Sequence, residues 1–267
     1  MDRPLIYVAQ LNHAVTKFYC RPNILVGMKP QLSAALLVGA CLALSGCATK
    51  DPQSLAQNDP WEPTNRAIFN FDIQLDHAVA EPVTRFYISA VPEVARDGIH
   101  NALTNLNAPV VFVNDGLQLD GDKASDTAGR FLVNSTVGLG GLIDVASKMG
   151  IPYHDNDFGI TLGKGGAAEG SYLVLPFVGP KPPRDLVGAG VDIAFDPLTY
   201  MSWNDSTLYM IIRAGLGVLD DQAANIDAVD SIERSSIDFY ATTRSLYRQN
   251  RAAQINGGQP NADLPNF

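Results

Sequence analysis

The stretch AGRFLVNSTVGLGGLIDVA, residues 128–146, joins a helical pattern to a glycine-rich apolar segment. Phe131 and Leu132 fall with two alanines on one side of a helix of 3.6 residues per turn. Gly138, Gly140 and Gly141 then lie among bulky apolar residues. Because a glycine inside a helix costs about 1 kcal/mol relative to alanine, they indicate either a tightly packed pair of helices or a kinked segment in lipid. The local pattern leaves both readings open.

Helical spacing recurs outward from this stretch, whereas strand signals are weak. The first helix is expected to end at Pro82 and the second at Pro109, because proline disrupts a helix interior. Residues 157–185 are rich in loop-forming residues, and Pro176 excludes their apolar run from a central strand. The longest helical pattern covers 206–249, with a break expected at its two glycines. The sequence therefore predicts a mainly α chain with little or no β structure.

The most apolar run, ALLVGACLALSGCATK at 34–49, stops at a cysteine and turns polar. From Leu32 to Cys47 it is too short for a membrane span, which takes about 20 residues. A preceding lysine and small residues at its end are typical of a secretory signal. Its ending, Leu-Ser-Gly-Cys, resembles the bacterial lipobox, in which the bond between Gly46 and Cys47 is cut and the cysteine receives lipid. We therefore expect a lipoprotein rather than a buried core helix.

Four parts of the chain follow from this reading. Met28 can begin a compact signal by itself, so Met1 and Met28 are both candidate start residues. The predicted parts are a signal peptide at 1–46 (with 1–27 as an over-extended start), a lipid-anchored tether at 47–60, a single helical domain at 61–250 and a tail at 251–267 that is disordered by composition.

Composition excludes several classes of function. Residues 1–46 hold four of the 19 basic residues and one of the 28 acidic ones, so the remaining chain has a net charge of −12. Such a chain is a poor ligand for nucleic acid, whose binding depends on Lys and Arg. Of the three cysteines, Cys20 and Cys41 leave with the signal, so no disulfide or thiol metal site remains. No cofactor is expected.

Catalytic motifs are also lacking. The segment GITLGKGG does not have the spacing of a phosphate-binding loop, and the three mature histidines show no metal-binding spacing. No serine stands in a G-x-S-x-G elbow. His154, with Asp155 and Asp157 beside it, is read as a solvated turn rather than a metal or acid–base cluster. The sequence therefore predicts a protein that is not an enzyme.

A succession of segments carries a family resemblance. In order, they are DPWEPTNRAIFNFD, EPVTRFY, VPEVARDGIHN, AGRFLVNSTVGLGGLIDVA, FGITLGKGGAAEGSYLVLPFVGP and RD followed by DPLTY. Over residues 59 to 250 this resembles the VacJ/MlaA family of outer-membrane lipoproteins. The resemblance implies a ring-like helical bundle with amphipathic helices embedded in the inner leaflet of the Gram-negative outer membrane. It also implies removal of misplaced phospholipid from the outer leaflet, which maintains lipid asymmetry.

The resemblance implies partners and a site as well. A periplasmic lipid-carrier protein would receive the phospholipid, and a trimeric porin would associate with the ring. Ala48, where an aspartate would signal retention in the inner membrane, favours the outer membrane. Asn70 and Phe71 match the family's Asn-Phe pair and are expected to affect channel gating, although the local pattern makes Phe71 a core anchor of its helix. Two rivals are a porin-associated scaffold without a lipid channel and a lipid-anchored hydrolase, for which no nucleophile is evident.

Overall fold

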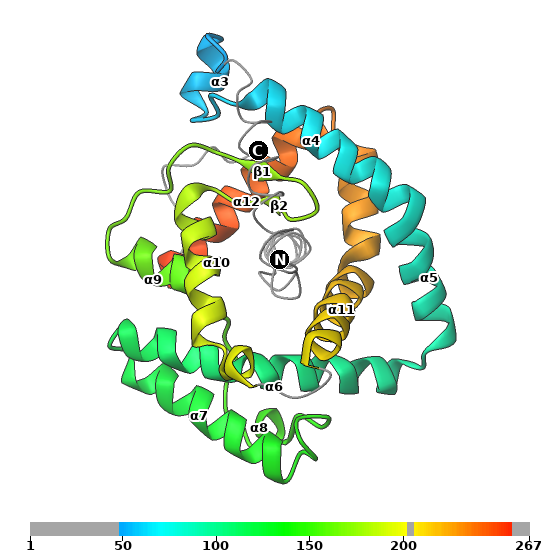
Figure 1. The fold of residues 1–267 in the computed structure, drawn as a ribbon, viewed down its shortest axis with the longest axis vertical. Coiled ribbons are helices and arrows are strands. Elements are labelled where there is room, and N and C mark those ends of the chain that lie inside the picture. Colours follow the sequence, from blue (N-terminus) through cyan, green and yellow to red (C-terminus); the bar gives the residue numbers. More distant parts are fainter. Residues whose placement is uncertain (1–47, 202–205, 258–267) are drawn as a thin grey trace, which may run out of the picture.

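The computed structural model describes residues 48–201 and 206–257. The predicted signal peptide, with Gly46 and Cys47, lies outside these ranges. The described helices follow one another around a closed circuit, with α7 and α8 outside α6 (Figure 1). The elements are α3 Pro52–Ala56, α4 Glu62–Leu75, a π-helical turn Asp76–Ala80, α5 Glu81–Ala90, α6 Glu93–Leu117, α7 Gly121–Thr136, α8 Val145–Lys148, α9 Phe158–Lys164, β1 Val174–Leu175, β2 Gly179–Pro180, α10 Pro183–Phe195, a 3-10 turn Pro197–Tyr200, α11 Ser206–Ser235 and α12 Phe239–Ile255.

This architecture confirms the prediction of a mainly α fold with little β structure. In the described part of the chain, the only strands are β1 and β2, which pair antiparallel across a short turn. Residues 158–164, expected to be loop, instead form α9, because the Asp157 side chain accepts the Ile160 N–H at 2.9 Å and caps the helix. No helix in the described ranges is both long enough and apolar enough to cross a bilayer.

Two expected helix ends are wrong, and both were placed at prolines. Pro82 lies at the start of α5, directly after the π-helical turn Asp76–Ala80, and this local change of helix type accommodates the missing N–H. The chain therefore stays helical through the π-helical turn and on to Ala90. Pro109 lies inside α6, which continues to Leu117 and packs along α7. Tertiary packing thus overrides the local effect of this proline.

The glycine-rich stretch after α7 is a non-helical turn rather than a helix pair or a kinked helix. Gly140 and Gly141 have φ angles of +73° and +97°, and Leu139 also has a positive φ of +56°. A Cβ on Gly138 would lie 2.3 Å from the Ile143 carbonyl oxygen, and one on Gly141 would lie 2.6 Å from Cβ of Asn105. Gly138 and Gly141 are therefore needed because neighbouring atoms approach the backbone closely, although the segment itself is not helical.

Three boundaries of the expected parts also differ. The helix α11 runs through the glycines at 215 and 217, and the break comes after Ser235, before Asp238 caps α12 by accepting the Ala241 N–H. The predicted disordered tail is wrong at its start, since α12 continues to Ile255 and Arg251 is buried. The predicted tether is wrong at its end, because Asp59 is fully buried.

The hydrophobic core is small and aromatic. It lies where α4, α12 and the β hairpin meet, and Phe69 and Tyr172 both contact the Tyr240 ring edge-on. Its buried members are Phe69, Tyr172, Val174, Ile232, Tyr240 and Tyr247. This core holds the two ends of the helical circuit together, because α4 and α12 are far apart in the sequence.

Candidate functional site

Polar side chains fill the interior of the fold. Among the described residues, buried polar and charged side chains outnumber buried hydrophobic ones. Asp59, fully buried, accepts hydrogen bonds from Asn65 at 2.7 Å, Tyr240 at 2.5 Å and Arg244 at 2.6 Å. Arg213 forms a second buried ion pair, with Asp196. Hydrogen-bonded charges therefore tie helices together where a water-soluble domain would use apolar packing.

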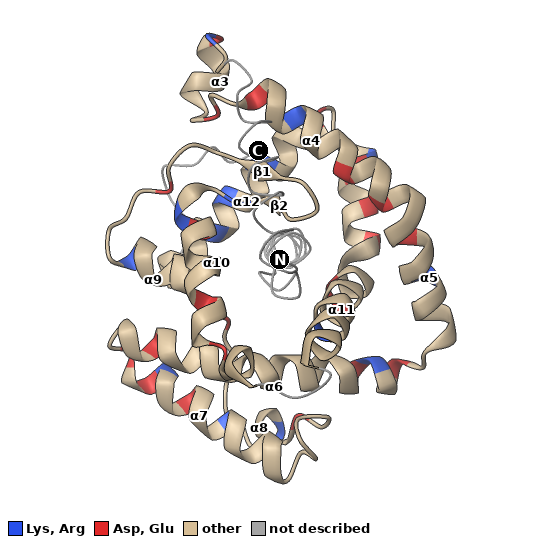
Figure 2. Cartoon of the chain, in the orientation of Figure 1, with Lys and Arg blue, Asp and Glu red and all other residues tan. Residues whose placement is uncertain are grey.

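Apolar side chains, in contrast, are exposed on the outside. Phe86 on α5 is 72% exposed, Val94 on α6 82%, and Leu139 in the turn after α7 66%. Figure 2 shows long stretches of ribbon without charge, while Lys and Arg gather where α10 and α12 meet. Exposed apolar surface of this extent marks a site for membrane or protein contact.

An aromatic pair stands on the exposed side of α4. Asn70 and Phe71 are both exposed, and the Phe71 ring, 48% exposed, meets Phe177 edge-on with centroids 5.7 Å apart. Phe177 lies in the turn between β1 and β2 with a φ of +65°. Asp72 accepts the Phe177 N–H at 2.9 Å, which fixes the turn against α4. The core anchor of α4 is Phe69, 3% exposed, so the core reading of Phe71 is wrong.

Two carboxyl groups lie just beyond this pair. Burial raises the pKa of Asp72 to about 6 and that of Asp76 to about 6. Asp76 begins the π-helical turn, and its ligand atoms lie with those of His77 and Glu81 within 4.8 Å of one another. Each nevertheless has its own partner: Gln222 donates to Asp76 at 2.6 Å, while Glu233 pairs with His77 and Arg85 with Glu81. Asp76 and His77 therefore join the π-helical turn to α11, and Glu81 pairs within α5, so the three groups serve structural contacts rather than a built metal centre.

The candidate cluster at 154–157 is not assembled. His154 contacts Asp115 at 2.9 Å, Asp155 accepts from Tyr153, and Asp157 pairs with Arg251 at 2.6 Å. His154 is also only 18% exposed in its side chain, so the reading as a solvated turn does not hold for it.

The partly buried His154 also does not form a hydrolase relay. Its Nε2 contacts both Asp115 and the Thr127 hydroxyl, at 2.9 and 3.4 Å, and that hydroxyl donates to Asp115 at 2.7 Å. A catalytic triad uses one ring nitrogen for the acid and the other for the nucleophile. Thr127 is therefore held by the carboxylate and is not activated by the imidazole.

A buried carboxyl group on α10 makes stability depend on pH. Burial, followed by the nearby Asp157 carboxylate, raises the pKa of Asp192 to about 7. Its Oδ1 accepts from Asn114 at 2.9 Å and from the Phe158 N–H at 3.0 Å, and its Oδ2 accepts from the same N–H at 3.2 Å. Since the ordinary pKa is 3.8, the folded protein holds this proton between about pH 4 and 7 while the unfolded chain has released it.

We expect folding stability to rise as the pH falls from 7 toward 4, and Asp192→Asn to reduce this dependence. Each such group contributes up to about 1.4 kcal/mol per pH unit within its window. Asp72 and Asp76 still contribute to the pH dependence of stability in the Asp192→Asn variant. Chemical unfolding at pH 5, 6 and 7 measures the slope. Equal slopes for the two proteins would show that Asp192 is ionised in the fold across this range.

Comparison with known proteins identifies the chain. Residues 57–254 match the family model described as MlaA lipoprotein. The chain belongs to the MlaA lipoprotein family. A solved structure described as "Structural basis for maintenance of bacterial outer membrane lipid asymmetry" is similar with a TM-score of 0.67 and 32% sequence identity, covering 74% of this chain and 99% of that one.

Curated relatives of the MlaA family agree. "Intermembrane phospholipid transport system lipoprotein MlaA" of Haemophilus influenzae is 33% identical over 237 residues, 87% of this chain and 93% of the relative. The protein of the same name from Escherichia coli is 34% identical over 236 residues, 87% of this chain and 91% of the relative. A Rickettsia felis protein of unstated function is 34% identical over 198 residues, 74% and 78% of the two chains.

Sequence reasoning on this MlaA family member missed the site's main polar elements. Asp72, Asp115 and Asp192 all lie within helices, where single acidic residues give no pattern of their own. Their burial in the folded chain identifies them. The contact between Phe71 and Phe177, 106 positions apart in the sequence, carries no local signal either.

Proposed function

We propose that this protein is a lipid-anchored member of the outer membrane that removes mislocalised phospholipid from the outer leaflet and passes it toward the periplasm. The observation that carries the proposal is the distribution of side chains, with charged networks inside and large apolar residues outside. Membership of a family whose curated members are named for intermembrane phospholipid transport supports it. The proposal includes no chemical step, so we infer that the protein is not an enzyme.

The geometry supports placement within a single leaflet. No described helix can span a bilayer, yet exposed apolar residues occur on helices from α4 to α11. Lipid offers no partner to unpaired backbone groups, so a helical solution is required for a surface in the hydrocarbon region. Polar groups on the inner side suit a phospholipid head group, which stays hydrated in transit, while exposed apolar groups suit the surrounding acyl chains.

The anchor and the partners are part of the same proposal. Cys47 would carry the lipid after cleavage at Gly46, and Ala48 favours delivery to the outer membrane on the periplasmic side of a Gram-negative cell. A soluble periplasmic carrier protein would receive the phospholipid. A trimeric porin would hold the ring in the membrane. The net charge of −12 expected after signal removal argues against nucleic acid as a partner.

We further propose that Asn70 and Phe71 take part in gating. Both are exposed on α4, and Phe71 touches Phe177, at the tip of the β turn that Asp72 holds. Because a single ring contact links Phe71 to the turn, the turn can separate from α4 at this point without disrupting the core. This arrangement favours a movable element over a structural anchor.

Surface phospholipid in a deletion strain tests the function. A phospholipase that acts only on the outer leaflet should release severalfold more product from the deletion strain than from its parent, and the intact gene should reverse this. Cys47→Ala should fail to complement because the anchor is lost, whereas Cys41→Ala, within the same apolar run, should complement. No accumulation in the deletion strain would contradict transport and favour the porin-associated scaffold without a lipid channel.

A further inference from the structure

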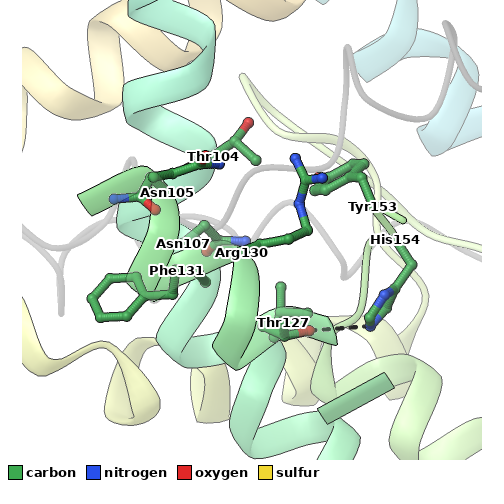
Figure 3. Close-up of a pocket in the computed structure, with 11 residues that line it drawn as sticks. Thr104, Asn105, Asn107, Thr127, Arg130, Phe131, Tyr153 and His154 are labelled. Carbon is green, nitrogen blue, oxygen red and sulfur yellow. Dashed lines mark hydrogen bonds between the residues drawn. The ribbon is translucent and has the colours of Figure 1, made fainter. Parts of the chain in front are cut away.

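A pocket away from the aromatic pair lies between α6, α7 and the segment that contains Tyr153 and His154. The pocket is shallow and partly open: its empty volume of about 390 Å³ includes open solvent, and the centre of a water-sized sphere can occupy about 30 Å³ of it. Figure 3 shows Arg130 running across it toward Tyr153, with Asn105 and Phe131 at the other end. Its lining combines polar side chains with the apolar side chains of Ala108, Val111 and Phe131.

The cation in this pocket keeps free hydrogen-bonding capacity. Arg130 is only 8% exposed; its Nη1 donates to Ser147 and to the Ile151 carbonyl at 2.9 and 2.7 Å, and its Nη2 donates to Asp144 at 2.7 Å. Within residues 48–201 and 206–257, the Nε–H donates to no protein group, yet it is not among the buried unpaired atoms. The Nε–H is therefore open to a ligand.

Arg130 also shares its carboxylate partner with other donors. Asp144 accepts from the Ser147 N–H, the Ser147 hydroxyl and Asn134 as well as from Arg130, and these contacts keep its pKa well below the usual range despite partial burial. A carboxylate with four donors competes weakly for the rest of the guanidinium. Tyr153, whose ring centroid lies 5.3 Å from Cζ, fixes the orientation of the group.

Two further donors line the same pocket from α6. Thr104 and Asn107 form no side-chain hydrogen bond to the described part of the chain, and Asn107 is exposed. A guanidinium edge, a hydroxyl and an amide on facing helices match the oxygen atoms of a phosphate group. At the edge of the pocket, Phe131 is 37% exposed, and the next residue, Leu132, is 62% exposed.

We propose that this pocket binds the phosphate of a glycerophospholipid head group, with the acyl chains lying on the exposed apolar side of α7. This inference rests on the proposed function and adds a peripheral binding site to it. Lipid is favoured over free phosphate because an acidic chain repels dissolved anions, whereas a lipid arrives by diffusion within the leaflet alongside Phe131 and Leu132.

Site-specific photocrosslinking tests the pocket. The full-length lipoprotein, with p-benzoylphenylalanine in place of Phe131, is reconstituted in vesicles of phosphatidylethanolamine and phosphatidylglycerol that contain phosphatidylethanolamine tritiated in its acyl chains. Thr104→Val/Asn107→Leu should lower labelled adduct about tenfold, which corresponds to about 1.4 kcal/mol, because both hydrogen bonds from α6 to the phosphate are lost. The control pair Thr136→Val/Asn101→Leu makes the same two replacements outside the pocket, on α7 and α6, and should leave the adduct unchanged.

The remaining arms identify the ligand. Diacylglycerol with the same tritiated chains should give little adduct at residue 131, and 10 mM inorganic phosphate should not compete. Equal adduct from diacylglycerol, full competition by phosphate, or equal adduct in the two double variants would each overturn the proposal. A second probe at Phe86, on the exposed side of α5, reports general lipid contact. If adduct forms at residue 86 while adduct at residue 131 is the same in both double variants, the pocket proposal is wrong but the proposed function stands. An unchanged surface phospholipid level in the deletion strain would instead reject the proposed function.

Discussion

Arg251→Ala is expected to lower the free energy of unfolding by about 3–5 kcal/mol, because removing one partner of a buried ion pair leaves uncompensated charge. Arg251 donates to both oxygens of Asp157 at 2.6 Å and to Asp185 at 3.0 Å. Asp185 is 2% exposed and also accepts from Tyr247 at 2.6 Å. Arg251 thereby links α12 to α9 and α10, which are separated from it by more than 60 positions in the sequence.

Thermal unfolding of the protein in mild detergent measures the effect. A loss of this size corresponds to roughly 10 °C in Tm for a chain of this length. Arg234→Ala is the matched control, since its side chain is 75% exposed and lies 3.8 Å from Asp230; we expect a change within about 0.5 kcal/mol. If the two variants unfolded at the same temperature, the cluster around Arg251 would not contribute to the closure of the ring.

This cluster also shows where sequence reasoning ends. Residues 251–267 have the polar composition of a disordered tail, and composition contains no information about a partner such as Asp157. Asp59 was likewise assigned to a tether, although Asn65, Tyr240 and Arg244 surround it. Ion pairs between distant positions leave no periodic signal, so the ends of the folded domain could not be read from local pattern.

Helices were predictable where the pattern is local. The spacing of Phe131 and Leu132 predicts α7, whereas the turn at Gly138 and Gly141 is neither the helix pair nor the kinked segment that the local pattern suggests. Periodicity does not say which face of a helix is buried when the surroundings are lipid. The local pattern therefore makes Phe71 the core anchor of its helix, whereas Phe69 is the buried residue.

Phe71→Ala is expected to raise surface phospholipid severalfold while changing stability little. The side chain is half exposed and its ring contact is with Phe177, so its removal leaves the core intact. Phe69→Ala provides the comparison: its ring is buried and contacts Phe239 and Tyr240 edge-on, and we expect a loss of about 3–5 kcal/mol. The outer-leaflet phospholipase assay on complemented deletion strains gives the first quantity, and thermal unfolding gives the second.

Deleting Asn70 and Phe71 together is a different perturbation from the single replacements. Removing two residues rotates the rest of the helix by about 200°, because each residue contributes about 100°. The deletion would then break the hydrogen bonds that the Phe177 N–H donates to Asp72 and that Gln222 donates to Asp76, together with the ring contact. We expect the deletion to raise surface phospholipid more than Asn70→Ala or Phe71→Ala. If Phe71→Ala and Asn70→Ala both leave it at the wild-type level, the pair has no gating role, and an effect of the deletion would come from the altered register of α4 alone.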